Sequence, residues 1–212
     1  MSESARTYIP VALIWSAYLA LHSAMISITA TTWLRSILGN GFRFYRLFFN
    51  FVALVGLVPV VLYSRSVKGE MLYAWDGYLV ILKWALIAAG VLLFVAGSRH
   101  YDMLQFLGVR QALAGARHTL INKSGELDTT GVLGLIRHPY YTATILLFWS
   151  GDLDTTDLVI NVVVTVYVVI GTWLEERKLV HEFGDSYRDY QRRVSMFVPW
   201  TWVRGKVGGS RT

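Results

Sequence analysis

Residues 77–98 read GYLVILKWALIAAGVLLFVAGS and carry a single charged side chain, Lys83. A helix needs about 20 mainly apolar residues to cross the hydrocarbon core of a bilayer, so this run is long enough to span one. Three more runs have the same character, at residues 10–30, 44–63 and 156–174. The pattern predicts an all-α fold, a polytopic membrane helix bundle.

A further apolar run, YYTATILLFWS at residues 140–150, is too short to span a bilayer alone. At ~1.5 Å per residue it covers only roughly 17 Å of a ~30 Å core. Either a helix begins near Thr130 and kinks at Pro139, or residues 140–150 form the short arm of a hairpin. In both cases the turn GDLDTTD, residues 151–157, joins this run to the last span. The expected bundle has about five transmembrane helices, including this C-terminal helical hairpin.

The composition supports a membrane protein and excludes several classes of site. The chain has 212 residues, of which 54% are hydrophobic and 16% charged, whereas a soluble domain carries about 25% charged residues. Cysteine is absent, which excludes disulfides and thiolate sites, and no metal site is predicted. The net charge of +6 comes from residues at the ends of the apolar runs. We therefore expect membrane lipids rather than nucleic acid as partners, and nothing implies a protein partner.

The distribution of Lys and Arg predicts the orientation in the membrane. These residues gather in residues 31–46, in residues 99–138 and after the last span, whereas the opposite side holds Arg6, Arg65 and Lys68. Loops rich in Lys and Arg stay on the cytoplasmic side. We therefore expect a protein of the cell (inner) membrane with its N-terminus outside and its C-terminus in the cytoplasm.

The chain is expected to divide into three regions. Residues 1–98 form an N-terminal three-helix membrane region, residues 99–203 hold a cytoplasmic segment, the helical hairpin and C-terminal helices, and residues 204–212 form a flexible tail. Residues 99–118 are predicted to continue the preceding helix with mixed polarity. Pro199 is expected to end the ordered region.

Three short motifs carry groups that could take part in chemistry. They are RHPYY at residues 137–141, LEERKL at residues 174–179 and FGDSYRDY at residues 183–190, in which Gly184 is expected to bend or break a helix. Each motif alone also fits a structural role. The first could be an interfacial anchor, with Pro139 in the first turn of a helix, the second a solvated helix start, and the third an amphipathic helix on the headgroups.

Together, these motifs and their spacing resemble the C-terminal signature of the isoprenylcysteine carboxyl methyltransferase-like and phospholipid methyltransferase-like membrane enzymes. Those families share an Arg-His-Pro-x-Tyr element, a short hairpin, a Glu-Glu pair, then Phe-Gly-x-x-Tyr-x-x-Tyr and a Pro. The resemblance covers roughly residues 129–199. Weaker similarities, such as YDMLQFLGVRQ at residues 101–111, resemble the bacterial branch, which includes methanethiol S-methyltransferases and proteins linked to nitric oxide metabolism. Where many relatives have a Gly after the first motif, this chain has Thr142 and Ala143.

The resemblance implies an enzyme, a methyltransferase that uses S-adenosylmethionine as cofactor at the cytoplasmic membrane interface. The acceptor would be a small thiol, which is favoured, or a membrane-dissolved or lipid-like molecule. The candidate catalytic residues are His138, Glu176 and Arg137. The candidate cofactor-binding residues are Arg137, His138, Tyr140, Tyr141, Glu175, Glu176, Tyr187, Tyr190 and Gln111.

These candidates suit the chemistry of the cofactor. Arg137 and His138 suit its carboxylate, either Glu175 or Glu176 suits its ammonium or ribose hydroxyls, and tyrosine rings can form aromatic walls near a sulfonium. His138 or a glutamate could deprotonate a thiol or amine acceptor.

An alternative is a haem- or quinone-binding membrane protein linked to nitric oxide metabolism, without methyltransferase activity. His22, His100 and His118 would be its candidate axial ligands. His22 lies in the middle of a span and is expected to point into the bundle. Lys83 and Arg46 lie near the ends of their spans and are expected to snorkel to the interface.

Overall fold

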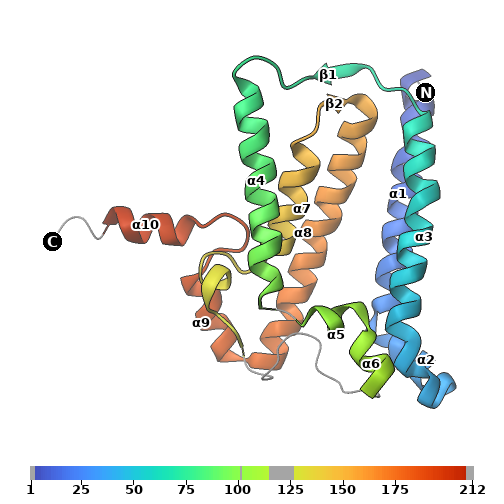
Figure 1. Ribbon diagram of the computed structural model, residues 1–212, viewed down its shortest axis with the longest axis vertical. Helices are drawn as coiled ribbons and strands as arrows, with labels where there is room; N and C mark the ends of the chain where they lie inside the picture. Colours follow the sequence, from blue (N-terminus) through green and yellow to red (C-terminus); the bar gives the residue numbers. More distant parts are fainter. Residues whose placement is uncertain (1–2, 101, 115–126, 209–212) are drawn as a thin grey trace. The chain divides into compact units, whose positions relative to one another are not determined.

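The structure is a computed structural model that describes residues 3–100, 102–114 and 127–208 (Figure 1). Contacts within the chain define two compact units. The first unit consists of Met1–Tyr73, Asp102–Leu120 and Leu153–Val164. The second unit consists of Ala74–Tyr101, Ile121–Asp152 and Thr165–Thr212.

Helices that could cross a membrane dominate the part of the chain that the structure describes. Four segments are long and apolar enough: Arg6–Ile26, Ile28–Ser66, Leu79–Ser98 and Thr155–Phe183. Large apolar side chains on these segments are exposed, such as Ile81 at 74%, as expected for helix faces that contact lipid. The predicted all-α, polytopic membrane bundle is confirmed.

The first unit is built on two antiparallel helices. Its helices are, in chain order, α1 (Glu3–Ile26), α2 (Ile28–Leu38), the 3-10 helix η1 (Gly39–Phe44), α3 (Tyr45–Ser66), α5 (Met103–Leu107) and α6 (Val109–Ala114). The indole Nε1 of Trp15 donates to Ser64 Oγ at 2.9 Å, and the Tyr45 hydroxyl donates to the Met25 carbonyl oxygen at 2.7 Å. These bonds tie the middle and the C-terminal end of α1 to opposite ends of α3, and they satisfy polar groups that lipid cannot.

The first predicted span ends earlier than residue 30. Helix α1 stops at Ile26, and Ser27 caps a new helix because its Oγ accepts a hydrogen bond from the Ala30 N–H at 3.2 Å. Helix α2 then ends at Leu38, and the next residue, Gly39, has φ +50°. A Ser in the extended conformation before an apolar stretch is a strong N-cap, and it outweighs the continuous hydropathy of the run.

The prediction that residues 99–118 continue the preceding helix is wrong. Helix α4 ends at Ser98, and two short helices, α5 and α6, follow with Gly108 between them. Gly108 has φ +91°, and a Cβ there would lie 2.7 Å from Arg46 Cβ. Only Gly fits this left-handed corner so close to another helix. Residues 115–118 lie outside the described residues.

Two polar side chains of α3 hold the end of α5. Arg46 Nε donates to the Phe106 carbonyl oxygen at 2.9 Å, and Asn50 Nδ2 donates to the Leu107 carbonyl oxygen at 2.9 Å. These carbonyls have no partner within so short a helix, so α3 satisfies them. Arg46 and Asn50 therefore have a structural contact within the first unit.

A small antiparallel ladder ties two loops of the first unit. Strand β1 (Met71–Tyr73) pairs with β2 (Leu153–Asp154), and Thr156 Oγ1 donates to the Val67 carbonyl oxygen at 3.1 Å. The turn at residues 151–157 thus lies at the same end as the loop that follows α3.

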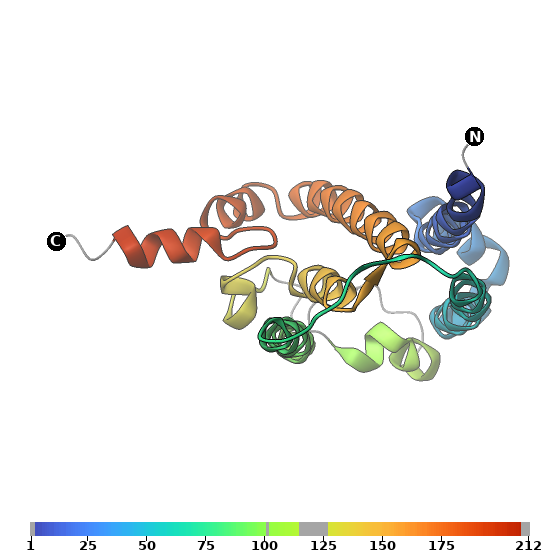
Figure 2. The same ribbon diagram turned by 90° about the horizontal axis from the view of Figure 1, so that it is seen from above.

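In the second unit, a short helix packs along a long one. The elements are α4 (Leu79–Ser98), the 3-10 helix η2 (Gly131–Gly134), α7 (Pro139–Trp149), the later part of α8 (Thr155–Phe183), α9 (Asp185–Arg193) and α10 (Trp200–Gly208). Helices α4 and α7 lie side by side (Figure 1 and Figure 2). A Cβ at Gly90 would lie 2.8 Å from Leu147 Cγ, and one at Gly97 would lie 3.3 Å from Tyr140 Cζ. The two glycines of α4 make room for larger side chains of α7.

Helix α7 is the short arm of a hairpin. It begins at Pro139 and has 11 residues, and the residues from Leu135 to His138 are not helical, so a kinked helix from near Thr130 is wrong. Lys83 Nζ lies 3.1 Å from Asp152 Oδ1 at the turn that follows α7. The turn and the start of α4 are therefore held together, and the short arm still completes the hairpin.

The C-terminal helices follow the predicted break. Helix α8 ends at Phe183, Gly184 has φ +58°, and α9 begins at Asp185, which confirms that Gly184 breaks the helix. The prediction that Pro199 ends the ordered region is wrong, because α10 begins directly after it. Pro is well tolerated just before or at the start of a helix. Residues 204–208, assigned to a flexible tail, belong to α10.

Candidate functional site

The carboxylate of Glu176, on α8, lies at the centre of a buried polar cluster in the second unit. Its Oε1 accepts hydrogen bonds from Arg137 Nε at 2.6 Å, His138 Nε2 at 2.9 Å and the Tyr187 hydroxyl at 3.2 Å. Its Oε2 accepts from Arg137 Nη2 at 2.9 Å and Gln191 Nε2 at 2.7 Å. A carboxylate offers about four lone-pair sites. The acceptor capacity of Glu176 is therefore filled by the protein itself.

The Arg137 side chain, like that of Glu176, is held by several hydrogen bonds. It binds Glu176 with two parallel hydrogen bonds, and its Nη1 donates to the carbonyl oxygens of Gln191 and Val194. Both charged side chains are only 7% exposed. Two buried charges are stable only when each is fully paired and hydrogen-bonded, and this pair meets that condition. Arg137 and Glu176 together form a rigid polar support.

His138 connects this support to a second, different carboxylate. Because a carboxylate only accepts, the hydrogen bond to Glu176 requires the proton on Nε2. The other ring nitrogen, Nδ1, lies 3.9 Å from Glu175 Oε2. That oxygen is buried and accepts no hydrogen bond from the residues that the structure describes, although the side chain as a whole is 34% exposed. Glu175 thus presents an unsatisfied negative oxygen beside His138.

Aromatic rings border the same histidine. The ring of Tyr141 stacks on His138 with centroids 5.6 Å apart and planes at 20°, and the ring of Phe197 lies 6.3 Å away. The motif places these groups through local structure. His138 is the residue before α7, and Pro139 occupies the first turn of that helix, where its missing N–H costs no hydrogen bond. Of the two alternatives left open for Pro139, a kink or a helix start, the structure has the helix start.

The chain segment after α9 fixes the backbone of the motif. Ile136 and Ser195 form a parallel bridge. The Arg137 N–H donates to the Ser195 carbonyl oxygen at 2.9 Å, and the His138 N–H donates to the Met196 carbonyl oxygen at 3.2 Å. Residues far apart in the sequence therefore set the position of the Arg137 and His138 side chains.

Helix α9 supplies the tyrosine face of the cluster. Tyr187 and Tyr190 are 1% and 3% exposed, and their rings meet edge to face with centroids 5.7 Å apart. The Tyr190 hydroxyl donates to the Leu133 carbonyl oxygen at 2.6 Å. Burial, with the charge of Glu176, raises the pKa of Tyr187, and burial raises the pKa of Tyr190. Both phenols therefore stay protonated and act as hydrogen-bond donors.

The structure brings together most of the predicted site residues, but not all. Arg137, His138, Tyr141, Glu175, Glu176, Tyr187 and Tyr190 share the second unit and its cluster. The ring of Tyr140 instead packs against Phe94 of α4, with centroids 5.3 Å apart. Gln111 lies on α6, in the first unit. Contact of any of these residues with a cofactor stays a prediction.

Sequence reasoning gave no role to three residues of this region. Gln191 lies four positions after Tyr187 on α9, so helical spacing could have placed it on the same face. Thr142 Oγ1 donates to the Phe197 carbonyl oxygen at 3.1 Å, which gives this departure from the related families a structural use. Phe197 had no signal of its own, because its position depends on how the chain returns after α9.

The histidines of the alternative hypothesis have other neighbours. The ring of His22 lies 5.0 Å from that of Phe49, and His100 Nδ1 lies 2.7 Å from Asp128 Oδ2. His118 lies outside the described residues. Within residues 3–100, 102–114 and 127–208, no group of three or more His, Cys, Asp or Glu side chains could hold a metal ion.

The fold and the site together define the class of this protein. It is a helical membrane bundle, in which a short hairpin and the helix after it bury a cluster of Arg, His, Glu and Tyr side chains. The chain belongs to the family described as NnrU protein, whose profile matches residues 11–207.

Curated relatives carry methyltransferase names. The chain is 36% identical over 132 residues to methanethiol S-methyltransferase 2 of Bradyrhizobium diazoefficiens, which covers 60% of this chain and 50% of the relative. It is 34% identical over 119 residues to methanethiol S-methyltransferase of Pseudomonas deceptionensis, and the alignment covers 56% of this chain and 42% of the relative. It is 29% identical over 135 residues to protein-S-isoprenylcysteine O-methyltransferase of Rattus norvegicus, and the alignment covers 58% of this chain and 44% of the relative.

The chain thus spans about half the length of the curated relatives it matches. No solved structure matches it.

Proposed function

We propose that this protein is a membrane-embedded methyltransferase that takes its methyl group from S-adenosylmethionine. The methyltransferase names of the relatives support the reaction class. The observation that carries the proposal is the unsatisfied Glu175 Oε2 beside His138. A buried carboxylate oxygen that accepts no hydrogen bond from the described residues is costly, and a ligand that brings a cation relieves that cost.

The residues present fit the cofactor. Its α-ammonium is the cation that Glu175 would hold, because the carboxylate of Glu176 is already filled. The ring faces of Tyr141 and Phe197 border His138 and would attract a sulfonium by ~1 kcal/mol. When bound, S-adenosylmethionine would supply an electrophilic methyl group.

Arg137 and Glu176 serve this site as positioning residues. Their buried ion pair holds the His138 ring through Nε2 and leaves Nδ1 facing Glu175. In the same proposal, Nδ1 of His138 acts as the base that takes the proton of a thiol acceptor, so that the sulfur can accept the methyl group. Orientation of the acceptor can supply roughly 7–11 kcal/mol of the barrier, which makes a rigid support valuable.

The acceptor class and the membrane side complete the proposal. A small thiol is favoured because several relatives are named for methanethiol, and a small lipid-like acceptor is the second choice. Glu176 lies near the end of the candidate span Thr155–Phe183, where a molecule dissolved in the bilayer and a cofactor from water can meet. We place this end on the cytoplasmic side of the inner membrane, as the Lys and Arg distribution favours.

Calorimetric titration of the detergent-purified protein with S-adenosylmethionine and S-adenosylhomocysteine tests the proposal. We expect binding tighter than about 1 mM for both, and binding weaker by roughly 10- to 100-fold in Glu175→Gln, which keeps the shape but removes the charge. Glu182→Gln is the matched control, because Glu182 is exposed on the same helix. If neither ligand binds the wild-type protein, or if both variants bind like it, the proposed function fails.

A further inference from the structure

Helix α10 (Trp200–Gly208) follows the chain segment that holds the backbone of Arg137 and His138. Its first turn is fixed to that segment, because the Thr201 N–H donates to Ser195 Oγ at 3.0 Å. The carbonyl oxygen of Ser195 in turn accepts from the Arg137 N–H at 2.9 Å. Helix α10 therefore begins at the level of the Arg137 backbone.

This level coincides with the end of a candidate membrane span in the same unit. Helix α4 ends at Ser98, and a Cβ at Gly97 would lie 3.6 Å from Pro139 Cγ. Pro139 comes two residues after Arg137 in the chain. Since the hydrocarbon core of a bilayer ends near the end of a span, α10 begins close to the boundary between hydrocarbon and headgroups.

The direction of α10 keeps it at this depth. Figure 1 shows α4 and α7 lengthwise with α10 lying across their direction. Figure 2, which is turned by 90°, shows α4 and α7 nearly end-on and α10 again lengthwise. A helix that lies across the direction of a span runs along the plane of the membrane.

Apolar side chains of α10 are exposed. Trp200 is 55% exposed, Trp202 45% and Val203 38%. The helix has nine residues, and an isolated helix shorter than about 12–15 residues is marginal in water. The interfacial layer of a bilayer would cover these side chains, and tryptophan is enriched in that layer.

The same helix face carries a cation. Trp200 and Val203 are three positions apart and share a face, and Arg204 follows Trp200 by four positions. The Arg204 guanidinium carbon lies 5.4 Å from the ring centroid of Trp200. An indole ring beside a guanidinium fits the boundary between acyl chains and phosphates, because the ring can stay in the acyl region while the charge reaches the headgroups.

We propose that α10 is an interfacial helix whose partner is the bilayer itself, with Trp200 and Val203 against the acyl chains and Arg204 at the phosphates. Through Ser195, α10 then anchors to the membrane the segment that holds the backbone of Arg137 and His138. The inference is independent of the proposed methyltransferase activity, because it concerns only where α10 lies.

Spin labelling tests the position of α10, because the chain has no cysteine and a single new one carries the label. Val203→Cys is labelled in the full chain, in nanodiscs of dioleoyl phosphatidylcholine and dioleoyl phosphatidylglycerol. Oxygen dissolves in hydrocarbon and a nickel chelate dissolves in water, so their relative access to the label reports its depth. Oxygen should have the greater access at Val203→Cys, as at Leu92→Cys, a position 67% exposed on α4. Ser186→Cys, exposed on α9, should show the reverse.

Two other results would overturn the proposal. If the nickel chelate has the greater access at Val203→Cys, α10 lies in water. If neither reagent reaches the label, protein covers α10, as in a contact with a second copy of the chain.

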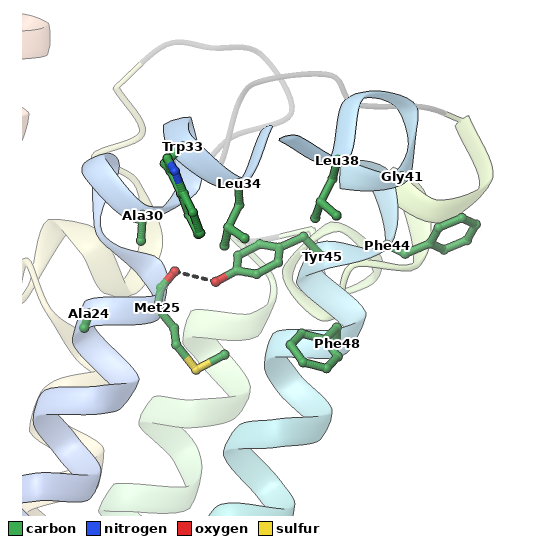
Figure 3. A pocket seen from close by; sticks show the side chains of 10 residues that line it. All are labelled: Ala24, Met25, Ala30, Trp33, Leu34, Leu38, Gly41, Phe44, Tyr45 and Phe48. Atoms are coloured by element: carbon green, nitrogen blue, oxygen red, sulfur yellow. Dashed lines mark hydrogen bonds between the residues drawn. The ribbon is translucent and has the colours of Figure 1, made fainter. Parts of the chain in front are cut away.

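Cleavage by trypsin in the same nanodiscs tests the apolar face. Trp200→Ser/Val203→Ser should raise the initial rate of cleavage after Arg204 by roughly tenfold, because α10 leaves the interface more often. Trp33→Ser/Leu38→Ser is the matched control and should leave that rate unchanged. Its two side chains are 61% and 45% exposed and line an apolar pocket of about 590 Å³ in the first unit (Figure 3). A melting curve shows that each variant is folded, and an unchanged rate in the α10 variant would mean that the proposal is wrong.

Discussion

At the scale of single residues, two adjacent glutamates have opposite environments. Glu176 is 5% exposed and receives hydrogen bonds from four side chains, whereas the buried oxygen of Glu175 receives none from the described residues. Consecutive positions on a helix point about 100° apart, so they meet different surroundings. Only one of the pair therefore has a charge left for a ligand.

This difference predicts opposite effects on stability. Glu176→Gln leaves the buried Arg137 without a countercharge and should cost about 3–5 kcal/mol, which lowers the apparent melting temperature by roughly 10 °C. Glu175→Gln removes a carboxylate whose buried oxygen accepts no hydrogen bond from the described residues, so it should leave the melting temperature unchanged or raise it. Scanning fluorimetry of the two variants in the same detergent, with Glu182→Gln as the surface control, measures both. Equal melting of Glu175→Gln and Glu176→Gln would contradict the assignment.

At the scale of elements, corners made by glycine decide where helices stop. The chain turns between α5 and α6 at Gly108, which combines φ +91° with a close approach to Arg46. Gly39 also has a positive φ, +50°, but no atom would lie within 4 Å of a Cβ there. The two positions separate the cost of backbone strain from the cost of a steric clash.

Gly108→Ala should destabilise the protein more than Gly39→Ala. Both substitutions force a Cβ into the left-handed region, at a cost of about 1–2 kcal/mol, but only at Gly108 would the new Cβ meet Arg46 Cβ at 2.7 Å and Leu47 N at 2.8 Å. We expect a further loss of about 1–3 kcal/mol there, as for other overpacked sites. Melting curves of the two variants give the comparison, and equal losses would show that α3 can move away.

How much the sequence predicts depends on whether a signal is local. Pro139 and Gly184 act on their own neighbours. The start of α7 was therefore one of the two alternatives considered at Pro139, and the break before α9 was predicted. The corner at Gly108 depends on the close approach of α3, which is distant in the sequence. Pro199 by itself did not indicate that a helix begins at the next residue, Trp200. The partners of Glu176 come from two separate segments of the chain, and one of them, Gln191, belongs to no recognised motif.

At the scale of the whole molecule, the membrane-spanning helices are established and their orientation is a prediction. The two compact units are built from interleaved segments, and the division into residues 1–98, 99–203 and 204–212 stays a prediction as well. The ladder between β1 and β2 places the hairpin turn at the same end as the loop after α3. Both loops should therefore lie on the same side of the membrane.

The absence of cysteine allows a direct test of orientation. Ser66→Cys, at the end of α3, should react with a membrane-impermeant maleimide in intact cells, because that loop is expected outside. Ser186→Cys, on α9, should react only after the cells are made permeable. Both serines are exposed. The reverse pattern would invert the orientation and put the cluster around Glu176 on the outer side.

The backbone pairing of Arg137 and His138 with Ser195 and Met196 has a consequence for biosynthesis. A ribosome makes the motif long before it makes the segment that completes it. The hairpin must therefore enter the bilayer before the backbone N–H groups of Arg137 and His138 meet the carbonyl oxygens that accept from them. Assembly of the cluster is then among the last events of folding, so a chain released before residue 196 would be inserted but unable to form it.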